Sequence, residues 1–478
     1  MRELTEELMA IAGATHVLTD PDLVAGYAAD WTGRYRGAAR CVVRPGSTNE
    51  VAAVVAACAA AGAPVVPQGG NTGLVGGSVP AAPIATAASR RRPALPVILS
   101  TRRLTDLGAV DETAAQVTAG AGITIARLAG HAARSGLRYG VDLASRDSAT
   151  VGGTIATNAG GIRTIRYGPT RAQVAGLTAV LADGSVVSDL SGLTAGAAGY
   201  DLAQLLTGSE GTLGVITTAR LTLRPAERPA AVLLAGVPGI AQAARLYREL
   251  RAAAPLLAAE YIDAPGLELV CRVTGLPRPL RSGWPGYLLA EIAAPSRASQ
   301  GAGRGADLPP DLAVLPDDVA VAQDGRGMAT LWAYRERVTE SIATAGIPHK
   351  VDVAIPAARL GPFRSELDDA VRGAAAGPGP VTVVVFGHIG VGNLHVNVIG
   401  PDPADIAVDE AVGRLAAAHG GSAVAEHGAG RAKATWLGWS RTAAEIAAMR
   451  AIKAALDPAG VLNPGVLLSP RPTEPRPA

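Results

Sequence analysis

Apolar and polar positions in the first half of the chain follow the short period of strands, interrupted by turn residues and one long helical stretch. Strands are predicted at 41–44, 64–66, 97–100, 116–119 and 214–225. Thr48–Ala61 has the apolar spacing of a buried helix, with Thr48 as its N-cap. Asp183-Gly184 separates two apolar runs and predicts a hairpin, because this dipeptide accepts the positive φ angles of a tight turn. Residues 1–34 are expected to form short helices.

The second half of the chain alternates longer helical patterns with strands. Helices are predicted at about 328–344, 357–374, 403–419 and 440–456. Strands are predicted at 286–293, 380–388 and 393–399. The change of pattern follows the sequence RPAERP, so domain ranges of 1–226 and 227–468 are predicted. The low-complexity stretch 295–311 is expected to be a mobile loop, and the Pro-rich tail 469–478 is expected to be disordered.

Composition and charge exclude several classes of function. The formal net charge is only +2, so the chain has no field that would attract nucleic acid or an anionic membrane. The longest uncharged stretch, 51–68, is interrupted by glycine and proline, so no membrane span is predicted, and the start lacks the apolar run of a signal peptide. No disulfide framework is predicted, and a reducing cytoplasm is expected, because the three cysteines follow no CxxC spacing.

A glycine-rich segment suited to a phosphate group follows one of the predicted strands. Residues 67–80, PQGGNTGLVGGSVP, place five glycines within nine residues. Glycine lets successive backbone N–H groups converge on an anion that approaches closely. The spacing fits neither GxxxxGK[ST] nor a GxGxxG that opens a helix. A tight turn that binds nothing is the plainer alternative for this segment alone. Two further glycine-rich stretches, 148–161 and 199–216, suggest three backbone walls around one large, flat, anionic cofactor.

Two histidines lie close together in the second half, in the segment GHIGVGNLH. If Val391-Gly392 form a two-residue turn, His388 faces His395, and Asn397 lies on the same face of the sheet. Two imidazoles so placed can chelate one ion, with Glu426 as the candidate carboxylate from elsewhere. From the residues alone, a pair of structural histidines on a half-buried sheet explains the pattern about as well.

A third group of residues offers positive charge for a carboxylate. Arg335 and Thr339 are four residues apart on a predicted helix and therefore share a face, with Trp332 beside them. Lys350 opens the strand that follows. A guanidinium can hold a carboxylate through two parallel hydrogen bonds. From the residues alone, a solvated helix with ion pairs at its surface is the preferred interpretation.

The three glycine-rich motifs, in this order and at these separations, resemble the FAD-binding domain of the vanillyl-alcohol-oxidase superfamily. Within it they resemble the D-2-hydroxyglutarate, D-lactate and glycolate dehydrogenase branch. The resemblance runs from about Asp30 to Gly465 and includes the patterns GHxGxGNLHxN, AEHG and WxxRExxT…K. It implies an α+β fold: a PCMH-type FAD-binding domain, and an α+β substrate or cap domain with an antiparallel sheet and a C-terminal helical part. No histidine lies in the flavin loops, so noncovalent FAD is expected.

The resemblance also implies a set of site residues. Those expected around FAD are Pro67, Gly69, Gly70, Asn71, Thr72, Gly73, Gly76, Gly77, Ser78, Ser148, Gly152, Gly153, Asn158, Gly160, Gly161, Glu210, Gly211, Ile216 and Asn463. A divalent metal, Zn²⁺ first with Mn²⁺ or Fe²⁺ open, is expected on His388, His395 and Glu426. His427 is the implied base, and the residues implied to hold the carboxylates are Arg335, Thr339, Lys350 and Asn397.

The expected reaction is the oxidation of a small D-2-hydroxy acid, first of all D-2-hydroxyglutarate, with hydride passing to flavin N5. Electrons are expected to leave to an electron-transferring flavoprotein or a quinone, and a homodimer is left open. The alternatives are a D-lactate or glycolate dehydrogenase, an oxidase that reduces O2, and an inactive flavin-binding scaffold. Two departures from the family pattern bear on the choice: Val391 replaces the usual Asp, and the Tyr and Ser that usually follow Lys350 are missing.

Overall fold

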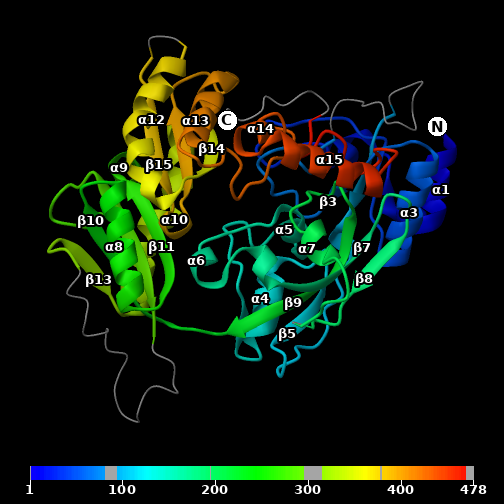
Figure 1. The fold of residues 1–478 in the computed structure, drawn as a ribbon, viewed down its shortest axis with the longest axis horizontal. Coiled ribbons are helices and arrows are strands. Elements are labelled where there is room, and N and C mark those ends of the chain that lie inside the picture. Colours follow the sequence, from blue (N-terminus) through cyan, green and yellow to red (C-terminus); the bar gives the residue numbers. More distant parts are fainter. Residues whose placement is uncertain (1, 81–93, 194, 295–314, 377–378, 470–478) are drawn as a thin grey trace. The chain divides into compact units, whose positions relative to one another are not determined.

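The computed structural model describes residues 2–80, 94–193, 195–294, 315–376 and 379–469 (Figure 1). The predicted loop at 295–311 lies outside these residues, as does the predicted tail except for its first residue. By contacts the chain divides into two compact units. Unit 1 is Met1–Gly161, Tyr167–Ala226 and Glu426–Ala478, and unit 2 is Ile162–Arg166 and Glu227–Ala425. No helix among the described residues is long and apolar enough to cross a membrane.

The described part of unit 1 holds a four-stranded and a five-stranded sheet. The first has the order β1 (Val17–Leu18), β2 (Cys41–Val43), β4 (Val97–Ser100), β3 (Val65–Gln68). The last three strands are parallel, which requires a crossover, and α3 (Thr48–Ala60) supplies it between β2 and β3. The predicted N-cap is off by one residue: Ser47, in extended conformation, caps this helix by accepting a hydrogen bond from Glu50 N.

The five-stranded sheet of unit 1 is antiparallel. Its strands are β5 (Gln116–Gly120), β9 (Val215–Pro225), β7 (Val174–Val180) and β8 (Val186–Asp189), with β6 (Leu137–Tyr139) also on β9. The predicted hairpin joins β7 to β8. Gly184 has φ 86°, and Asp183 Oδ1 accepts from Ser185 N at 2.8 Å, so this dipeptide closes the turn as expected.

The last segment of the chain returns to unit 1. Leu462 adds to the four-stranded sheet through a parallel bridge to Val65, and Val461 and Leu462 are fully buried in the same apolar core as that sheet. The contact division therefore places Glu426–Ala478 with unit 1, whereas the predicted range carried the second domain through to residue 468. The other helices here are α1 (Arg2–Ala12), α2 (Pro21–Tyr27), α4 (Ile125–Ala133), α5 (Val151–Thr157), α7 (Leu202–Leu206), α14 (Leu437–Ser440) and α15 (Ala443–Leu456). The short helix α6 (Thr164–Tyr167) has its first three residues in unit 2 and its last in unit 1.

Unit 2 is built on a seven-stranded antiparallel sheet. The strand order is β13 (Val319–Ala322), β10 (Pro229–Val237), β12 (Gly286–Ala293), β11 (Leu256–Asp263), β15 (Thr382–His388), β16 (Asn393–Ile399), β14 (His349–Ala354). Helices α8 (Ile240–Ala253), α12 (Leu360–Ala374) and α13 (Ile406–Ala418) pack on one face of this sheet. Helices α9 (Ala264–Thr274), α10 (Gly325–Glu336) and α11 (Val338–Ala345) pack on the other. The single helix predicted at 328–344 is thus divided at Arg337.

Candidate functional site

The first glycine-rich loop, which leaves β3, presents an unused row of backbone donors. Among the described residues, no N–H group from Gly70 to Ser78 has a hydrogen-bond acceptor. The side chains hold the loop in shape: Asn71 Nδ2 donates to Ala29 O at 2.8 Å, and Ser78 Oγ donates to Asn71 Oδ1 at 2.8 Å. Backbone N–H groups are rarely left without partners in a folded chain, so this row is suited to an anionic ligand.

The second glycine-rich stretch approaches the first without room for side chains. A Cβ atom on Gly70 would lie 2.0 Å from the carbonyl oxygen of Ser148, and one on Gly69 would lie 2.4 Å from Thr150 Oγ1. Gly152 is equally confined, because a Cβ atom on it would lie 2.6 Å from Ala121 Cβ. The glycines that lie near the expected diphosphate therefore also let two loop backbones meet.

The side chains of Glu210 and Asn463 link the third glycine-rich stretch, 199–216, to the first, 67–80, and to the last segment of the chain. Glu210 is buried, and its backbone has a positive φ angle of 51°. Its two carboxylate oxygens accept from Ala429 N and Gly430 N, each at 2.8 Å. Asn463 Nδ2 donates to Gly77 O at 2.9 Å and to Glu210 O at 2.8 Å. Burial raises the pKa of Glu210, while the two N–H donors act in the opposite direction. The side chains of Glu210 and Asn463 thus maintain the loop framework.

The turn between β15 and β16 differs from the predicted two-residue turn. Ile389–Val391 form a short 3-10 turn, and Gly392 takes the left-handed conformation at φ 69°. The positive φ angle therefore falls on glycine, and Val391, which is exposed, is not among the described residues with positive φ. The replacement of the family's usual Asp by Val391 consequently introduces no backbone strain.

The register of these two strands is shifted by two residues from the predicted one. Phe386 lies opposite His395, and His388 lies opposite Asn393, so the predicted direct pairing of the two histidines is wrong. A shift of two residues leaves every side chain on its original face, because side chains alternate with a period of two. The imidazoles of His388 and His395 therefore still share a face, and their ring centroids are 5.5 Å apart.

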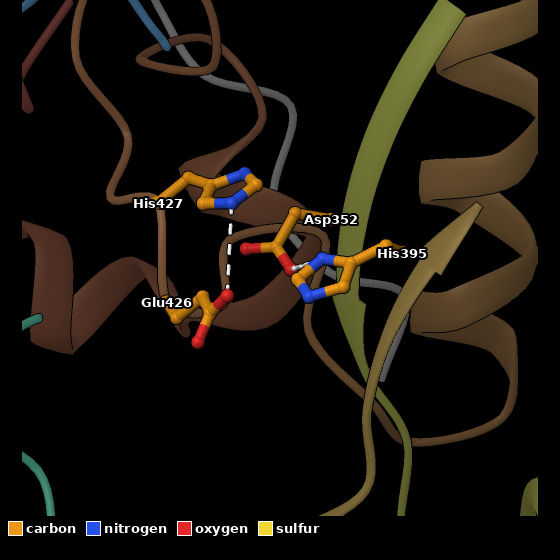
Figure 2. Close-up of side chains that lie close together, drawn as sticks. All are labelled: Asp352, His395, Glu426 and His427. Carbon is orange, nitrogen blue, oxygen red and sulfur yellow. Dashed lines mark ion pairs between the residues drawn. The ribbon is translucent and has the colours of Figure 1, made fainter. Parts of the chain in front are cut away.

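Each of these histidines is held by a buried carboxylate. His388 Nδ1 donates to Glu260 Oε1 at 2.6 Å, and His395 Nδ1 lies 3.2 Å from Asp352 Oδ1, a pair drawn in Figure 2. The two carboxylates are 0% and 1% exposed. An imidazole that donates from Nδ1 keeps the lone pair on Nε2, which is the arrangement of a metal-binding histidine. Burial tends to raise the pKa of Glu260, but attraction to His388 and Arg335 lowers it overall.

Three of the four predicted carboxylate-binding residues lie near the histidines or their carboxylates, and the fourth, Thr339, is exposed. Arg335 is buried in the last turn of α10, with Nε donating to Glu260 Oε2 at 2.6 Å and its guanidinium 4.6 Å from the centroid of the Phe386 ring. Lys350 and Asn397 lie opposite each other on β14 and β16, on the face that carries the histidines. Thr339 is exposed in the first turn of α11, so the expected single helical face with Arg335 is interrupted.

Glu426 and His427 belong to unit 1, at the start of its last segment. Glu426 Oε1 lies 3.7 Å from His427 Nε2, and both side chains are about a fifth to a quarter exposed (Figure 2). The next residue, Gly428, has φ 79°, and Ala429 and Gly430 are the donors to Glu210. The pair is therefore partly accessible, and Glu210 anchors the backbone at Ala429, two residues after His427.

Sequence reasoning missed three buried acidic residues on the same face of the sheet. These are Glu260 on β11, Glu291 on β12 and Asp352 on β14. The signal was present, because each glutamate lies in the interior of a strand whose eight residues are all buried, LLAAEYID and GYLLAEIA. A carboxylate is costly to bury unless it is paired, so a glutamate inside a mostly apolar strand indicates a buried partner.

Comparisons with known proteins give the family and the fold. Residues 39–189 match the model "FAD binding domain", and residues 226–467 match "FAD linked oxidases, C-terminal domain". The chain is 38% identical over 465 residues to a D-2-hydroxyglutarate dehydrogenase of Xanthomonas citri pv. viticola, covering 95% of this chain and 94% of that protein. It is 36% identical over 458 residues to the mitochondrial D-2-hydroxyglutarate dehydrogenase of Bos taurus, covering 95% and 81%.

A solved structure confirms the architecture. The fold is similar to that of 4-ethylphenol oxidase from Gulosibacter chungangensis, with a TM-score of 0.71, 17% identity and 98% of each chain covered. The predicted α+β fold of the vanillyl-alcohol-oxidase type is therefore confirmed. The predicted resemblance to the D-2-hydroxy acid dehydrogenase branch is confirmed by the curated relatives.

Proposed function

The chain belongs to the FAD-linked oxidases, and on that basis we propose that it is a dehydrogenase of D-2-hydroxy acids, with D-2-hydroxyglutarate as its substrate. The relatives named above carry the substrate assignment. The observation in this chain that carries the chemistry is one polar face in an otherwise apolar sheet, where two histidines are each held by a buried carboxylate. Ionisable groups are expensive to bury, and such clusters concentrate at functional sites.

The glycine-rich loops of unit 1 fit the cofactor. The row of N–H groups from Gly70 to Ser78 matches the needs of a diphosphate, and the confined glycines leave the loop backbones open to close approach. FAD, when bound, supplies the acceptor for the hydride that leaves the substrate. We propose that the attachment is noncovalent, because none of the seven histidines lies in the three loops.

The two imidazoles of unit 2 fit a divalent metal. With Nδ1 of each committed to a carboxylate, Nε2 of His388 and His395 is the coordinating atom, and Glu426 is the proposed third ligand. Nitrogen and carboxylate donors suit Zn²⁺, with Mn²⁺ or Fe²⁺ as alternatives, and such an ion supplies a Lewis acid. His427, adjacent to the proposed ligand Glu426, is the proposed base for the hydroxyl proton.

The carboxylates of the substrate are proposed to be held by Arg335, Lys350 and Asn397. Glu260 already occupies Nε of Arg335, so only part of its charge remains for a ligand. Its two terminal Nη groups have no hydrogen-bond acceptor within the described residues and form the fork that a carboxylate accepts. The role of Thr339 stays a prediction, as does the choice of a dicarboxylate over D-lactate or glycolate.

The deciding experiment follows the bleaching of bound flavin under anaerobic conditions. D-2-Hydroxyglutarate, D-malate, D-lactate, glycolate and the L-enantiomers are added, and kcat/KM is measured for those that react. The D-dicarboxylates are expected to react best, and Arg335→Ala is expected to lower their kcat/KM about 10–100-fold, because a charge-assisted hydrogen bond is lost. If D-lactate matches them on the unaltered protein, the dicarboxylate assignment is wrong. If no acid bleaches the flavin, the chain is a binding scaffold.

The electron acceptor and the cellular location are proposals of the same kind. An electron-transferring flavoprotein or a quinone is the proposed acceptor, and stoichiometric peroxide formation in air would indicate an oxidase instead. A reducing cytoplasm is proposed because Cys41, Cys58 and Cys271 are all free thiols.

A further inference from the structure

We infer that Glu260 is a positioning residue that joins the proposed metal-binding histidine to the proposed carboxylate-binding arginine, so that one buried side chain orients both. This inference rests on the function proposed above. Glu260 lies in the middle of β11, a strand whose eight residues are all buried, and it is itself 0% exposed. No family motif recognised in the sequence includes it.

The geometry assigns one carboxylate oxygen to each partner. Oε1 accepts from His388 Nδ1 at 2.6 Å, and Oε2 accepts from Arg335 Nε at 2.6 Å. Phe386 lies two residues before His388 on β15, and the centroid of its ring is 4.6 Å from Cζ of Arg335. This ring therefore holds the guanidinium in place from a second side. Both partners and the stacking ring belong to unit 2.

Two consequences follow from this arrangement. A carboxylate only accepts hydrogen bonds, so it selects the His388 tautomer with the proton on Nδ1 and the lone pair on Nε2, as metal binding requires. By engaging Nε, it also sets the plane of the Arg335 guanidinium and turns the two Nη groups toward a ligand. Loss of Glu260 is therefore expected to weaken metal binding and substrate binding together, although its carboxylate touches neither.

Glu291 provides a matched control. It lies on the neighbouring strand β12, on the same face, and is 2% exposed. Its Oε2 accepts from Trp332 Nε1 at 2.9 Å, and its Oε1 forms an ion pair with Arg163 Nη1 at 2.8 Å. Removing its charge has a cost similar to that of any buried ion pair, but it leaves His388 and Arg335 untouched.

The experiment compares Glu260→Gln and Glu291→Gln in the full chain with FAD bound. A glutamine side chain can accept from one partner only and presents an N–H group to the other, so one of the two bonds must break. For Glu260→Gln the dissociation constant of Zn²⁺, measured by chelator competition after metal stripping, should rise about 10–100-fold. The KM for D-2-hydroxyglutarate, at saturating Zn²⁺, should rise about tenfold with a smaller change in kcat. Flavin content should not change.

Each other outcome is informative. Equal rises of the Zn²⁺ dissociation constant in both variants would show that Glu260 is an ordinary buried carboxylate and would overturn the inference. Unchanged Zn²⁺ and substrate affinities in Glu260→Gln would overturn it while leaving the proposed function intact. If the unaltered protein binds no divalent metal but still oxidises the acid, the proposed metal site is wrong, and the inference is lost with it. Thermal melting of both variants controls for misfolding.

Discussion

The flavin loops of unit 1 and the polar sheet face of unit 2 are two different ways of building a binding site. The loops use backbone N–H groups, and they gather these groups by removing side chains at positions such as Gly69 and Gly70. The sheet face uses side chains, and it supports His388 and His395 with carboxylates buried at 0% and 1% exposure. The first region should therefore be sensitive to added volume, and the second to lost charge or hydrogen bonding.

The largest expected effect is the loss of metal and activity, with FAD retained, on replacing a histidine of the polar sheet face. His388→Ala or His395→Ala should remove the metal and lower activity by about a thousandfold, since several kcal/mol of transition-state stabilisation are lost with a Lewis acid. FAD should remain bound, because the loops proposed to hold it lie in unit 1, whereas both histidines lie in unit 2. Metal analysis, flavin absorbance and kcat/KM on one preparation test this.

His419→Ala is the matched control, since His419 Nε2 lies 3.3 Å from Glu366 Oε2 and His419 is not one of the proposed metal ligands. It should keep both the metal and the flavin. Loss of FAD together with the metal in His388→Ala would show that these histidines are structural.

The next effect tests the flavin loop by volume alone. Gly70→Ala would place a Cβ 2.0 Å from a backbone oxygen, so the two loops must separate, at a cost of about 1–3 kcal/mol or more. Gly130→Ala in α4 of the same unit is the control, because nothing lies within 4 Å of its Cβ position and its φ angle is not positive. Flavin retained per protein after gel filtration should fall in the first variant and stay near the unaltered value in the second. Similar retention in both would contradict the close approach of the loops.

A smaller effect concerns the buried carboxylate in unit 1. Glu210→Gln leaves one of the two N–H groups at Ala429 and Gly430 without an acceptor, which should lower the free energy of unfolding by about 1–3 kcal/mol. Urea unfolding of the variant and of the unaltered chain measures this difference in free energy, provided that both show the same dependence on urea concentration. A loss of less than about 0.5 kcal/mol would mean that this link adds nothing to stability.

The same residue should give the folding equilibrium a pH dependence. Because burial raises the pKa of Glu210 in the folded chain above its ordinary value of 4.5, the folded state binds more protons than the unfolded state between the two values. The contribution of Glu210 to stability should therefore be largest below pH 4.5 and decline as the pH rises through the raised pKa. Subtracting the Glu210→Gln profile from that of the unaltered chain isolates this slope, and an absent or opposite slope contradicts the expected pKa direction.

The last prediction concerns how the flavin is attached, and here no covalently bound flavin is expected. Acid precipitation should release all of the yellow colour into the supernatant, because the loops contain no histidine that could form a covalent bond. Colour that stays in the pellet would refute noncovalent binding.

Much of the fold could be predicted from the sequence because its signals are local. The glycine-rich loops are contiguous, the hairpin at Asp183-Gly184 depends on two residues, and the strands at 286–293 and 393–399 have the predicted bounds. The face shared by His388 and His395 also followed from the sequence, because side chains alternate along a strand whatever the length of the turn. The register itself did not, since it depends on Ile389–Val391 forming a 3-10 turn.

What only the tertiary structure decided is which distant residues meet. Glu260 is 75 residues from Arg335 and 128 from His388 in sequence, so no periodicity or motif could join the three. The return of the last segment to unit 1 likewise depends on Leu462 pairing with Val65 across most of the chain. The sequence by itself determined that these strands are apolar, that their few ionisable residues are exceptional, and which face the histidines share. Burial then decided the partners, because a carboxylate inside a sheet is stable only where donors from other strands and helices reach it.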